Sequence, residues 1–352
     1  MMRHFCTYFD RNYLSRGLAL YRSLQALGRP FQLWVLCMDP VCHAALASAE
    51  LPGIRPIALE DFERGDDALL RAKANRTLVE YYFTCTASLP RYVFREEPGI
   101  DLLTYVDADL YFFADPEPLF EELAGGSIAI IEHRISKRLG PLEQYGRYNV
   151  GWISFRRDAN GMACLEWWRD RCLEWCYDRV EPGRFAEQKY LDEWPRRFGG
   201  VVVLRHPGAN AAPWNLADHP VRWDGDRLRV GESPLLFFHF HGFRHLGGRL
   251  YDPNLSRYRA RLSKTARLHV YHPYIRALHE ADGEISPHSG NTSLGTSVRH
   301  PLPTPFVQRV VKRIRRLGRF WIGLASGHYL LAPRPGTSKR RVSGSASVPA
   351  RS

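Results

Sequence analysis

The stretch LLTYVDADLYFF, residues 102–113, sets two carboxylates, Asp107 and Asp109, into an otherwise apolar run. Residues 102–106 read as a buried β-strand, and an ionised carboxylate at its end needs a partner because desolvation costs several kcal/mol. Residues i and i+2 of an extended strand point to the same face, so the two carboxylates are expected to converge on one point. Carboxylate oxygens suit Mg²⁺ or Mn²⁺, and a divalent cation is the expected partner.

A second pair of aspartates, Asp224 and Asp226, has the same spacing. It lies in VRWDGDRLRV, residues 221–230, where an Asp-Gly turn between alternating segments predicts a β-hairpin with solvated aspartates. The apolar flanks of Asp107 and Asp109 distinguish that pair from this one. The structural alternative for Asp107 and Asp109 is that they end the strand and cap the next helix.

Strand-like and helix-like segments alternate along the chain. Strands are expected at residues 5–9, 31–38, 54–59, 101–106, 127–132, 149–155 and 234–243. Helices are expected at residues 12–27, 76–88 (ending near Pro90), 158–177 and 255–281. This order predicts an α/β fold with a Rossmann-like, mostly parallel sheet flanked by helices. Ligands of such sheets bind beyond the carboxyl ends of the strands, where Asp107 falls.

The composition is that of a folded, enzyme-sized protein, with 352 residues of which 45% are hydrophobic. The net charge of +12 is unevenly distributed, because residues 301–352 contain eleven Arg or Lys and no Asp or Glu. Residues 1–300 therefore carry only +1. A nearly neutral body does not support a nucleic-acid-binding catalytic surface, so no nucleic acid partner is expected.

The seven cysteines show no CxxC spacing, which predicts free thiols in a reducing compartment. Cys172 and Cys176 share a helix face with an apolar stripe, so core packing is the favoured interpretation over a metal site. Charges interrupt the N-terminus, and no apolar run approaches the ~20 residues that span a bilayer. A cytoplasmic protein is predicted, peripheral on the inner face of a membrane.

The composition changes after the last predicted strand and helix. The expected division is a catalytic domain at residues 1–282, a flexible linker at 283–305, a basic amphipathic helix at 306–332 and a disordered basic tail at 333–352. Residues 306–324, FVQRVVKRIRRLGRFWIGL, carry six basic residues, no acidic ones and a helical apolar stripe. This pattern predicts binding to an anionic membrane surface. Packing of the helix on the catalytic domain is the alternative.

Five motifs follow one another in a characteristic order: TYFDRNY at residues 7–13, DAD at 107–109, YNVGWISF at 148–155, EQKYLDEW at 187–194 and HFHGFR at 239–244. Over residues 1–249 the chain thus resembles GT-A-fold glycosyltransferases of the glycogenin-like (family 8-like) group. The resemblance implies metal-dependent transfer of a sugar from a nucleotide sugar, expected to be a UDP-sugar, with retention at the anomeric centre. The acceptor, a glycan, a lipid-linked sugar or a protein, is not identified by these motifs.

The resemblance also implies roles for individual residues. The ligands of Mn²⁺ (or Mg²⁺) would be Asp107, Asp109 and His239. The nucleotide-sugar site would be formed by Thr7, Tyr8, Tyr13, Arg76, Asp107, Asn149, Gly151, Gly242 and Arg244. Gln188 and Glu187 would approach the anomeric centre as the catalytic residues. The chain departs from the family pattern where Glu187 replaces Asp and Asp192 replaces Asn.

Several alternatives remain open at this point. His241 would lie on the same strand face as His239, so an H-x-H zinc site or a packed core histidine is possible. If the enzyme inverts, Glu187 or Asp192 would be the base. A second enzymatic hypothesis is a metal-dependent phosphohydrolase with Asp107 as its nucleophile. A non-catalytic, membrane-surface sugar-binding protein is the third.

Overall fold

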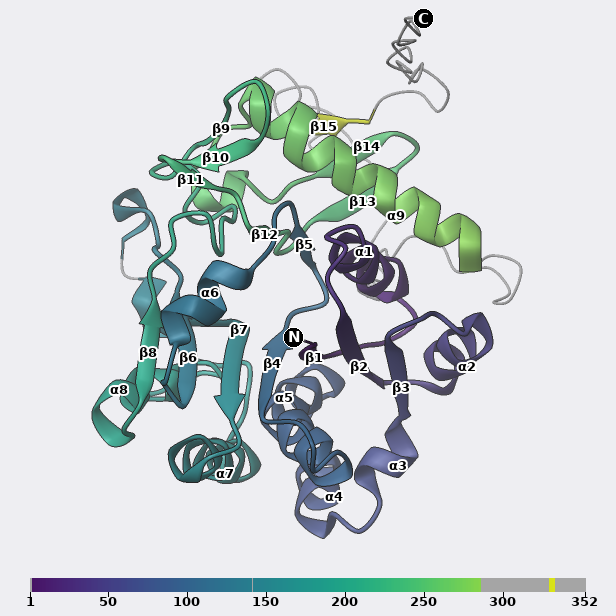
Figure 1. Ribbon diagram of the computed structural model, residues 1–352, viewed down its shortest axis with the longest axis vertical. Coiled ribbons are helices and arrows are strands. Elements are labelled where there is room, and N and C mark those ends of the chain that lie inside the picture. The colour runs from purple at the N-terminus through teal and green to yellow at the C-terminus, as the bar shows by residue number, and fades with distance from the viewer. Residues whose placement is uncertain (1, 141, 286–328, 333–352) are drawn as a thin grey trace, which may run out of the picture.

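The computed structural model of the protein describes residues 2–140, 142–285 and 329–332. Within these residues, seven strands form a central sheet in the order β3-β2-β1-β4-β7-β6-β8 (Figure 1). Their bounds are β1 Arg3–Phe9, β2 Phe31–Cys37, β3 Ile54–Ala58, β4 Leu102–Val106, β6 Ile128–Glu132, β7 Tyr148–Arg156 and β8 Val201–Leu204. Six of the seven predicted strands lie in this sheet, with ends within two residues of the expected ones. The seventh, expected at residues 234–243, lies outside it, and β8 was not predicted.

The sheet is mostly parallel, as predicted. Strands β1, β2, β3 and β4 run parallel to their neighbours, and β6 runs parallel to β8. The exception is β7, which is antiparallel to both β4 and β6. The carboxyl ends of β1, β2 and β4 therefore meet at one edge of the sheet, and Asp107 follows β4 directly at this edge.

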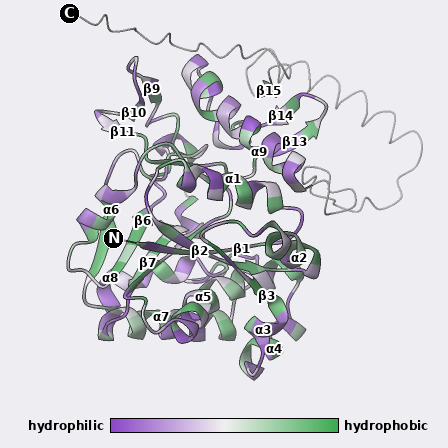
Figure 2. Cartoon of the chain, turned by 45° about the vertical axis from the view of Figure 1, so that its right-hand side comes forward, coloured by the Kyte–Doolittle hydropathy of each residue, from purple (hydrophilic) through white to green (hydrophobic). Residues whose placement is uncertain are grey.

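Helices cover both faces of the sheet (Figure 1). Their bounds are α1 Leu14–Gln25, α2 Pro40–Ala49, α3 Leu59–Glu63, α4 Asp67–Ala74, α5 Leu78–Glu96, α6 Glu117–Leu123, α7 Ala159–Glu174, α8 Trp194–Arg197 and α9 His272–Ile285. One core lies between the sheet and α5 with α7, and a second lies between the sheet and α1, α2 and α6. Successive residues of β1 supply the two cores in turn, as Phe5 and Cys6 show. Along the helices around the sheet, hydrophobic and hydrophilic residues alternate, as in helices with one buried and one exposed face (Figure 2).

The predicted end of the helix near Pro90 is wrong, because α5 continues to Glu96 with Pro90 inside it. A capping box between Thr77 and Glu80 starts the helix. At its other end the Arg157 guanidinium donates hydrogen bonds to the carbonyls of Phe94, Glu97 and Ile100. Proline removes one backbone hydrogen bond, but the capped ends and a deeply buried face keep the segment helical.

Smaller sheets lie beyond the central one. Strand β5 (Leu110–Phe112) pairs antiparallel with β12 (Phe237–His239). Strands β9 (Val221–Trp223), β10 (Leu228–Val230) and β11 (Ser233–Pro234) form the predicted hairpin and its extension. Asp224 accepts hydrogen bonds from the Asp226 and Arg227 amides in the turn, which confirms its structural role.

The predicted helix over 255–281 begins later than expected. A short 3-10 turn at Ser256–Tyr258 is followed by a π-helical segment, Ala266–Tyr271, which leads directly into α9. Arg259 has a left-handed backbone with φ of 50°, and this conformation interrupts a helix. Helix α9 packs against α1 and extends to Ile285, so the linker expected from residue 283 starts in a helix.

Most of the predicted C-terminal helix and tail lie outside the described residues. Within 306–332, residues 329–332 are described, and Leu330–Leu331 form strand β15 rather than helix. The third small sheet is β13 (Arg244–Gly247), β14 (Leu250–Asp252) and β15, in which Leu330 is buried. Among the helices that the structure describes, none has a stretch long and apolar enough to cross a membrane.

Candidate metal centre

Two chain segments more than a hundred residues apart meet at the carboxyl edge of the sheet. Asp107 follows β4 directly, as predicted, but Asp107 and Asp109 lie in the turn between β4 and β5 and not in the extended backbone from which their convergence was inferred. The antiparallel register of β5 and β12 places His239 opposite Leu110, and the Phe240 amide donates a hydrogen bond to the Asp109 carbonyl. The carboxylates therefore converge through a tight turn, and strand pairing brings His239 to them.

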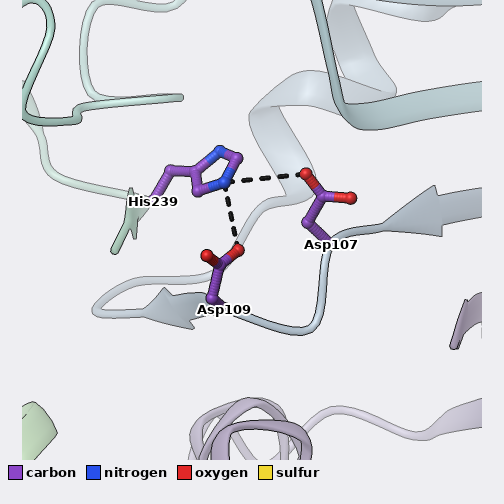
Figure 3. Close-up of side chains that lie close together, drawn as sticks. All are labelled: Asp107, Asp109 and His239. Carbon is purple, nitrogen blue, oxygen red and sulfur yellow. Dashed lines mark ion pairs between the residues drawn. The ribbon is translucent and has the colours of Figure 1, made fainter. Parts of the chain in front are cut away.

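Asp107, Asp109 and His239 point toward one another (Figure 3). The His239 Nε2 atom lies 3.0 Å from Asp109 Oδ1 and 3.6 Å from Asp107 Oδ2. One ligand atom from each side chain falls within 4.8 Å of the others, which makes this a group able to hold a metal ion. Two ligands about 2.1 Å from one cation at right angles lie about 3 Å apart, so these separations fit a single small divalent cation.

His239 is held from behind by strand β7. Its Nδ1 atom lies 3.3 Å from Asn149 Oδ1, which also accepts a hydrogen bond from the Gly151 amide. A Cβ atom at Gly151 would lie 2.9 Å from His239 Nδ1, so only glycine leaves room for the imidazole. The NVG part of the YNVGWISF motif, residues 149–151, thus has a structural reason: Asn149 orients the histidine, and Gly151 leaves room for its ring.

The charges of the three side chains are interdependent. Burial raises the pKa of Asp107 above the ordinary carboxyl value, despite the opposing effect of His239. Burial also disfavours ionised Asp109, but the charge and hydrogen bond of His239 outweigh it and lower the pKa of Asp109. Burial would lower the pKa of His239, yet Asp109 and Asp107 together raise it. Without a metal, a proton on His239 thus balances part of the negative charge that a cation would otherwise neutralise.

Tyr8 stands close to this centre. Asp107 and Glu187 both act on its hydroxyl electrostatically, although burial is the main reason for its raised pKa. The Thr86 hydroxyl lies 3.2 Å from the Tyr8 hydroxyl, and the Tyr8 ring contacts those of Tyr82 and Tyr105. Tyr8 is thus a packed aromatic whose hydroxyl lies near Asp107 and Glu187, and its role in donor binding stays a prediction.

The other two predicted residues of the first motif differ in exposure. Thr7 is fully buried, and its hydroxyl has no hydrogen-bond partner among the described residues. Tyr13 is 41% exposed and packs its ring on the Arg16 guanidinium, 4.2 Å from the ring centroid. Of the two, Tyr13 presents the larger surface to a ligand.

Glu187 is a buried carboxyl with an unusual environment. Its Oε2 atom has no hydrogen-bond partner in the part of the chain that the structure describes. Burial is the main cause that raises the pKa of Glu187 to about 8, and the Asp107 charge adds to it. Ala186, just before it, has a left-handed backbone with φ of 45°. A buried carboxyl with a raised pKa and one oxygen that lacks a hydrogen-bond partner, near a metal-ligand group, is characteristic of functional sites.

The rest of the EQKYLD segment is tied to the neighbouring loop. Gln188 Nε2 donates to the Tyr145 carbonyl, and Lys189 Nζ donates to the Glu143 carbonyl. Asp192 accepts a hydrogen bond from the Arg147 amide. Gln188 and Asp192 therefore have structural roles, and the catalytic role of Gln188 stays a prediction.

The remaining predicted residues have various surroundings. Arg76 donates to the Thr84 hydroxyl and to the Leu173 carbonyl, and no described interaction connects it to the carboxylates. Gly242 has a left-handed φ of 67°, and a Cβ atom there would collide with Asn254. Arg244 forms an ion pair with Asp252 and is about half exposed. Roles of these residues in donor binding stay predictions.

His241 is not part of the metal-ligand group found among the described residues. Its ring lies 5.8 Å from that of His239 and contacts Trp214 at 5.5 Å between ring centroids. Strand β12 ends at His239, so the alternation that would have pointed both imidazoles the same way stops there. The structure therefore favours His239 as the third ligand. The cysteines expected to pack in the core, Cys172 and Cys176, are buried and unpaired, as predicted.

Sequence reasoning missed two residues that act directly on the metal-ligand group. Arg16, buried on α1, donates to the Phe243 carbonyl, and its charge helps lower the pKa of Asp109 after the larger effects of burial and His239. Trp214 packs its ring against His239, with 5.0 Å between centroids. Neither residue belongs to a recognisable motif. The only sequence signal for Arg16 is its position about one helical turn beyond the TYFDRNY motif.

Fold and site together define an α/β protein with a two-aspartate, one-histidine centre at the carboxyl edge of its sheet. No family model matches the chain. It is 34% identical over 253 residues to the uncharacterized protein YfnF of Bacillus subtilis (strain 168), covering 69% of this chain and 82% of YfnF. It is 30% identical over 310 residues to the uncharacterized protein YfnD of the same strain, covering 87% of this chain and 98% of YfnD. The chain belongs to the family of YfnF and YfnD.

Solved structures of similar fold include two glycosyltransferases. The galactosyltransferase LgtC, in complex with donor and acceptor sugar analogs, is 17% identical with a TM-score of 0.48, covering 80% of this chain and 96% of LgtC. The glycosyltransferase GlyE of Streptococcus pneumoniae TIGR4 is 14% identical with a TM-score of 0.47, covering 82% of this chain and 63% of GlyE.

Proposed function

We propose that the protein is a metal-dependent GT-A glycosyltransferase of the glycogenin-like type, which transfers a sugar from a UDP-sugar with retention. The observation that carries the proposal is the convergence of Asp107, Asp109 and His239 within 4.8 Å at the carboxyl edge of the sheet. Two carboxylates and one imidazole suit Mn²⁺ better than Mg²⁺, which prefers oxygen ligands alone. The DAD and HFHGFR motifs that supply these ligands are two of the five on which the resemblance rests.

The chemistry demands stabilisation of negative charge on a leaving diphosphate. A divalent cation, when bound to Asp107, Asp109 and His239, would supply most of that stabilisation. Arg244, beside Gly242, would add a positive charge for the phosphates. Burial of His239 and Asp109 keeps water from weakening these electrostatic interactions.

Glu187 would bind the sugar. Its unpaired Oε2 atom offers a hydrogen-bonding position that a sugar hydroxyl can complete. A pKa of about 8 leaves the carboxyl mostly protonated at neutral pH, so it is a poor general base there. A weak base in this position would suit retention better than a base-assisted inversion. Gln188 would then face the anomeric centre as a neutral group.

We also propose that the protein works at the cytoplasmic surface of a membrane. The support is the sequence of residues 306–324, with six basic residues, no acidic ones and an apolar stripe. Strand β15 fixes the chain to the catalytic domain shortly after this segment, because Leu330 is buried and pairs with Tyr251. A basic segment tethered at both ends would keep the active site near a membrane-bound acceptor.

The test is a donor screen. Purified protein with Mn²⁺ is incubated with UDP-glucose, UDP-galactose and UDP-N-acetylglucosamine, and UDP release is measured. Release from one donor that requires Mn²⁺ and disappears in D109N supports the proposal. Hydrolysis of p-nitrophenyl phosphate, with a covalent adduct on Asp107 trapped by mass spectrometry, would instead establish the phosphohydrolase. Sugar binding that ignores Mn²⁺, without turnover, would establish the non-catalytic binding protein.

A further inference from the structure

His133 belongs to none of the five motifs, yet it lies directly behind the metal-ligand group. It follows β6, is buried, and packs its ring edge-on against Trp214 with 5.3 Å between centroids. The Trp214 indole and the Asn215 amide both donate to its carbonyl, at 2.7 Å and 3.0 Å. These contacts fix the backbone and the ring, so the two ring nitrogens have defined neighbours.

The hydrogen bonds of His133 have only one consistent direction. Its Nδ1 atom lies 3.2 Å from the Arg147 carbonyl, which can only accept, so Nδ1 carries the proton. Its Nε2 atom lies 3.2 Å from Asn149 Nδ2, which can only donate, so Nε2 accepts. Burial lowers the pKa of His133 to about 4, in agreement with a neutral ring.

The same assignment of donors and acceptors extends through Asn149 to His239. With Nδ2 facing His133, Oδ1 faces the Gly151 amide and His239 Nδ1, at 3.2 Å and 3.3 Å. An oxygen in this position requires a proton on His239 Nδ1. The unprotonated nitrogen of a neutral His239 is then Nε2, which points at Asp107 and Asp109 (Figure 3). If the Asn149 side-chain amide were rotated by 180°, its Nδ2 donor would face the Gly151 N–H, and neither group would have an acceptor.

We infer that His133 is a positioning residue for the metal centre: it orients Asn149, and Asn149 holds His239 with Nε2 free to bind a divalent cation. Without this chain, a neutral His239 would place its proton on Nε2, where Asp109 accepts it, and that nitrogen could not bind a metal. The inference rests on the proposed function only in its assumption that the three residues bind a cation.

The experiment measures binding of Mn²⁺ alone, from the electron paramagnetic resonance signal of the free ion. H133L is expected to weaken binding about 10–100-fold, the usual cost of losing a group that orients a metal ligand. H133Q can both donate to Arg147 and accept from Asn149, so it should stay within about threefold of wild type. H206L, at a half-buried histidine outside this chain of bonds, is the control. If H133L does not fold, H133F fills the space against Trp214 and replaces it.

A double-mutant cycle separates positioning from a general structural role. If His133 acts through Asn149, H133L should weaken Mn²⁺ binding by less than about twofold in an N149A background. Equal losses in both backgrounds, or wild-type affinity in H133L, would overturn the inference while leaving the proposed function intact. Absence of Mn²⁺ binding in wild type would overturn the metal centre and this inference together.

Discussion

Gly151 lies where any side chain would collide with His239: a Cβ atom there would fall 2.9 Å from Nδ1 of the imidazole and 2.6 Å from Asn149 Oδ1. The glycine comes from the middle of β7 and the histidine from the end of β12. Neither His239 Nδ1 nor Asn149 Oδ1 can move away without loss, because the contact between them orients His239 toward the carboxylates. The position of His239, the candidate third metal ligand, therefore depends on the absence of a side chain on a neighbouring strand.

G151A should weaken Mn²⁺ binding by at least about tenfold and destabilise the protein by roughly 1–3 kcal/mol, since the added methyl pushes His239 out of place. Calorimetric Mn²⁺ titration and thermal unfolding measure the two effects. G125A is the matched control, because a Cβ atom at Gly125 meets no atom within 4 Å. Equal affinity in G151A and G125A would contradict the proposed role of the glycine.

E187Q should change how stability depends on pH. The ordinary pKa of a glutamate is 4.5, and that of Glu187 in the folded protein is about 8. The stability that the protonated Glu187 carboxyl contributes to the folded state is therefore fully present below pH 4.5 and is lost as the pH rises through 8. Each pKa unit is worth about 1.4 kcal/mol, so wild type should lose roughly 2–4 kcal/mol relative to E187Q between pH 5 and pH 9. Denaturant unfolding of both proteins at the two pH values tests this. Parallel pH dependence would show that Glu187 titrates normally.

R157M should destabilise the fold without affecting metal binding. Arg157 donates to three carbonyls around the end of α5, and its loss removes these hydrogen bonds, although the Glu97 carbonyl still accepts one from the Ile100 amide. We expect a decrease of about 2–3 kcal/mol in the free energy of unfolding. R71M, an exposed arginine on α4, should stay within about 0.5 kcal/mol of wild type. A similar loss in both variants would contradict this account of the helix end.

Replacing the six basic residues of 306–324 by glutamine should reduce co-sedimentation with vesicles that contain anionic lipid by at least about tenfold. Each basic residue near such a surface contributes about 1 kcal/mol. The control replaces Lys339, Arg340 and Arg341, which lie beyond β15, and should lose much less. Unchanged binding of the first variant would leave the membrane proposal without support, whatever the enzyme activity.

Six of the seven strands of the sheet could be predicted because they are apolar segments separated by clear turns, whereas β8, only four residues long, was missed. Asp107 could be placed at the carboxyl edge for the same reason. Two local predictions failed where tertiary contacts outweighed local signals. Pro90 did not end α5, because the helix is buried and Arg157 caps its far end. Arg259 interrupts the segment that was predicted to be helical from residue 255.

The site was only partly predictable. The resemblance led to His239, but sequence alone could not decide between His239 and His241, because that depends on where β12 ends. Arg16, Trp214 and His133 were missed, since their roles arise from contacts between segments far apart in the chain. A buried histidine carries no sequence signal that separates an orienting residue from a packed one.

The most direct test of the proposed function is a calorimetric titration with UDP, with and without Mn²⁺, on wild type, D109N and D226N. Asp226 has the same spacing from Asp224 that Asp109 has from Asp107, but it lies exposed in a turn. We predict that wild type and D226N bind UDP only with Mn²⁺ and that D109N does not bind it. UDP binding that is independent of Mn²⁺, or that D109N retains, would contradict a nucleotide-diphosphate metal site at Asp107, Asp109 and His239.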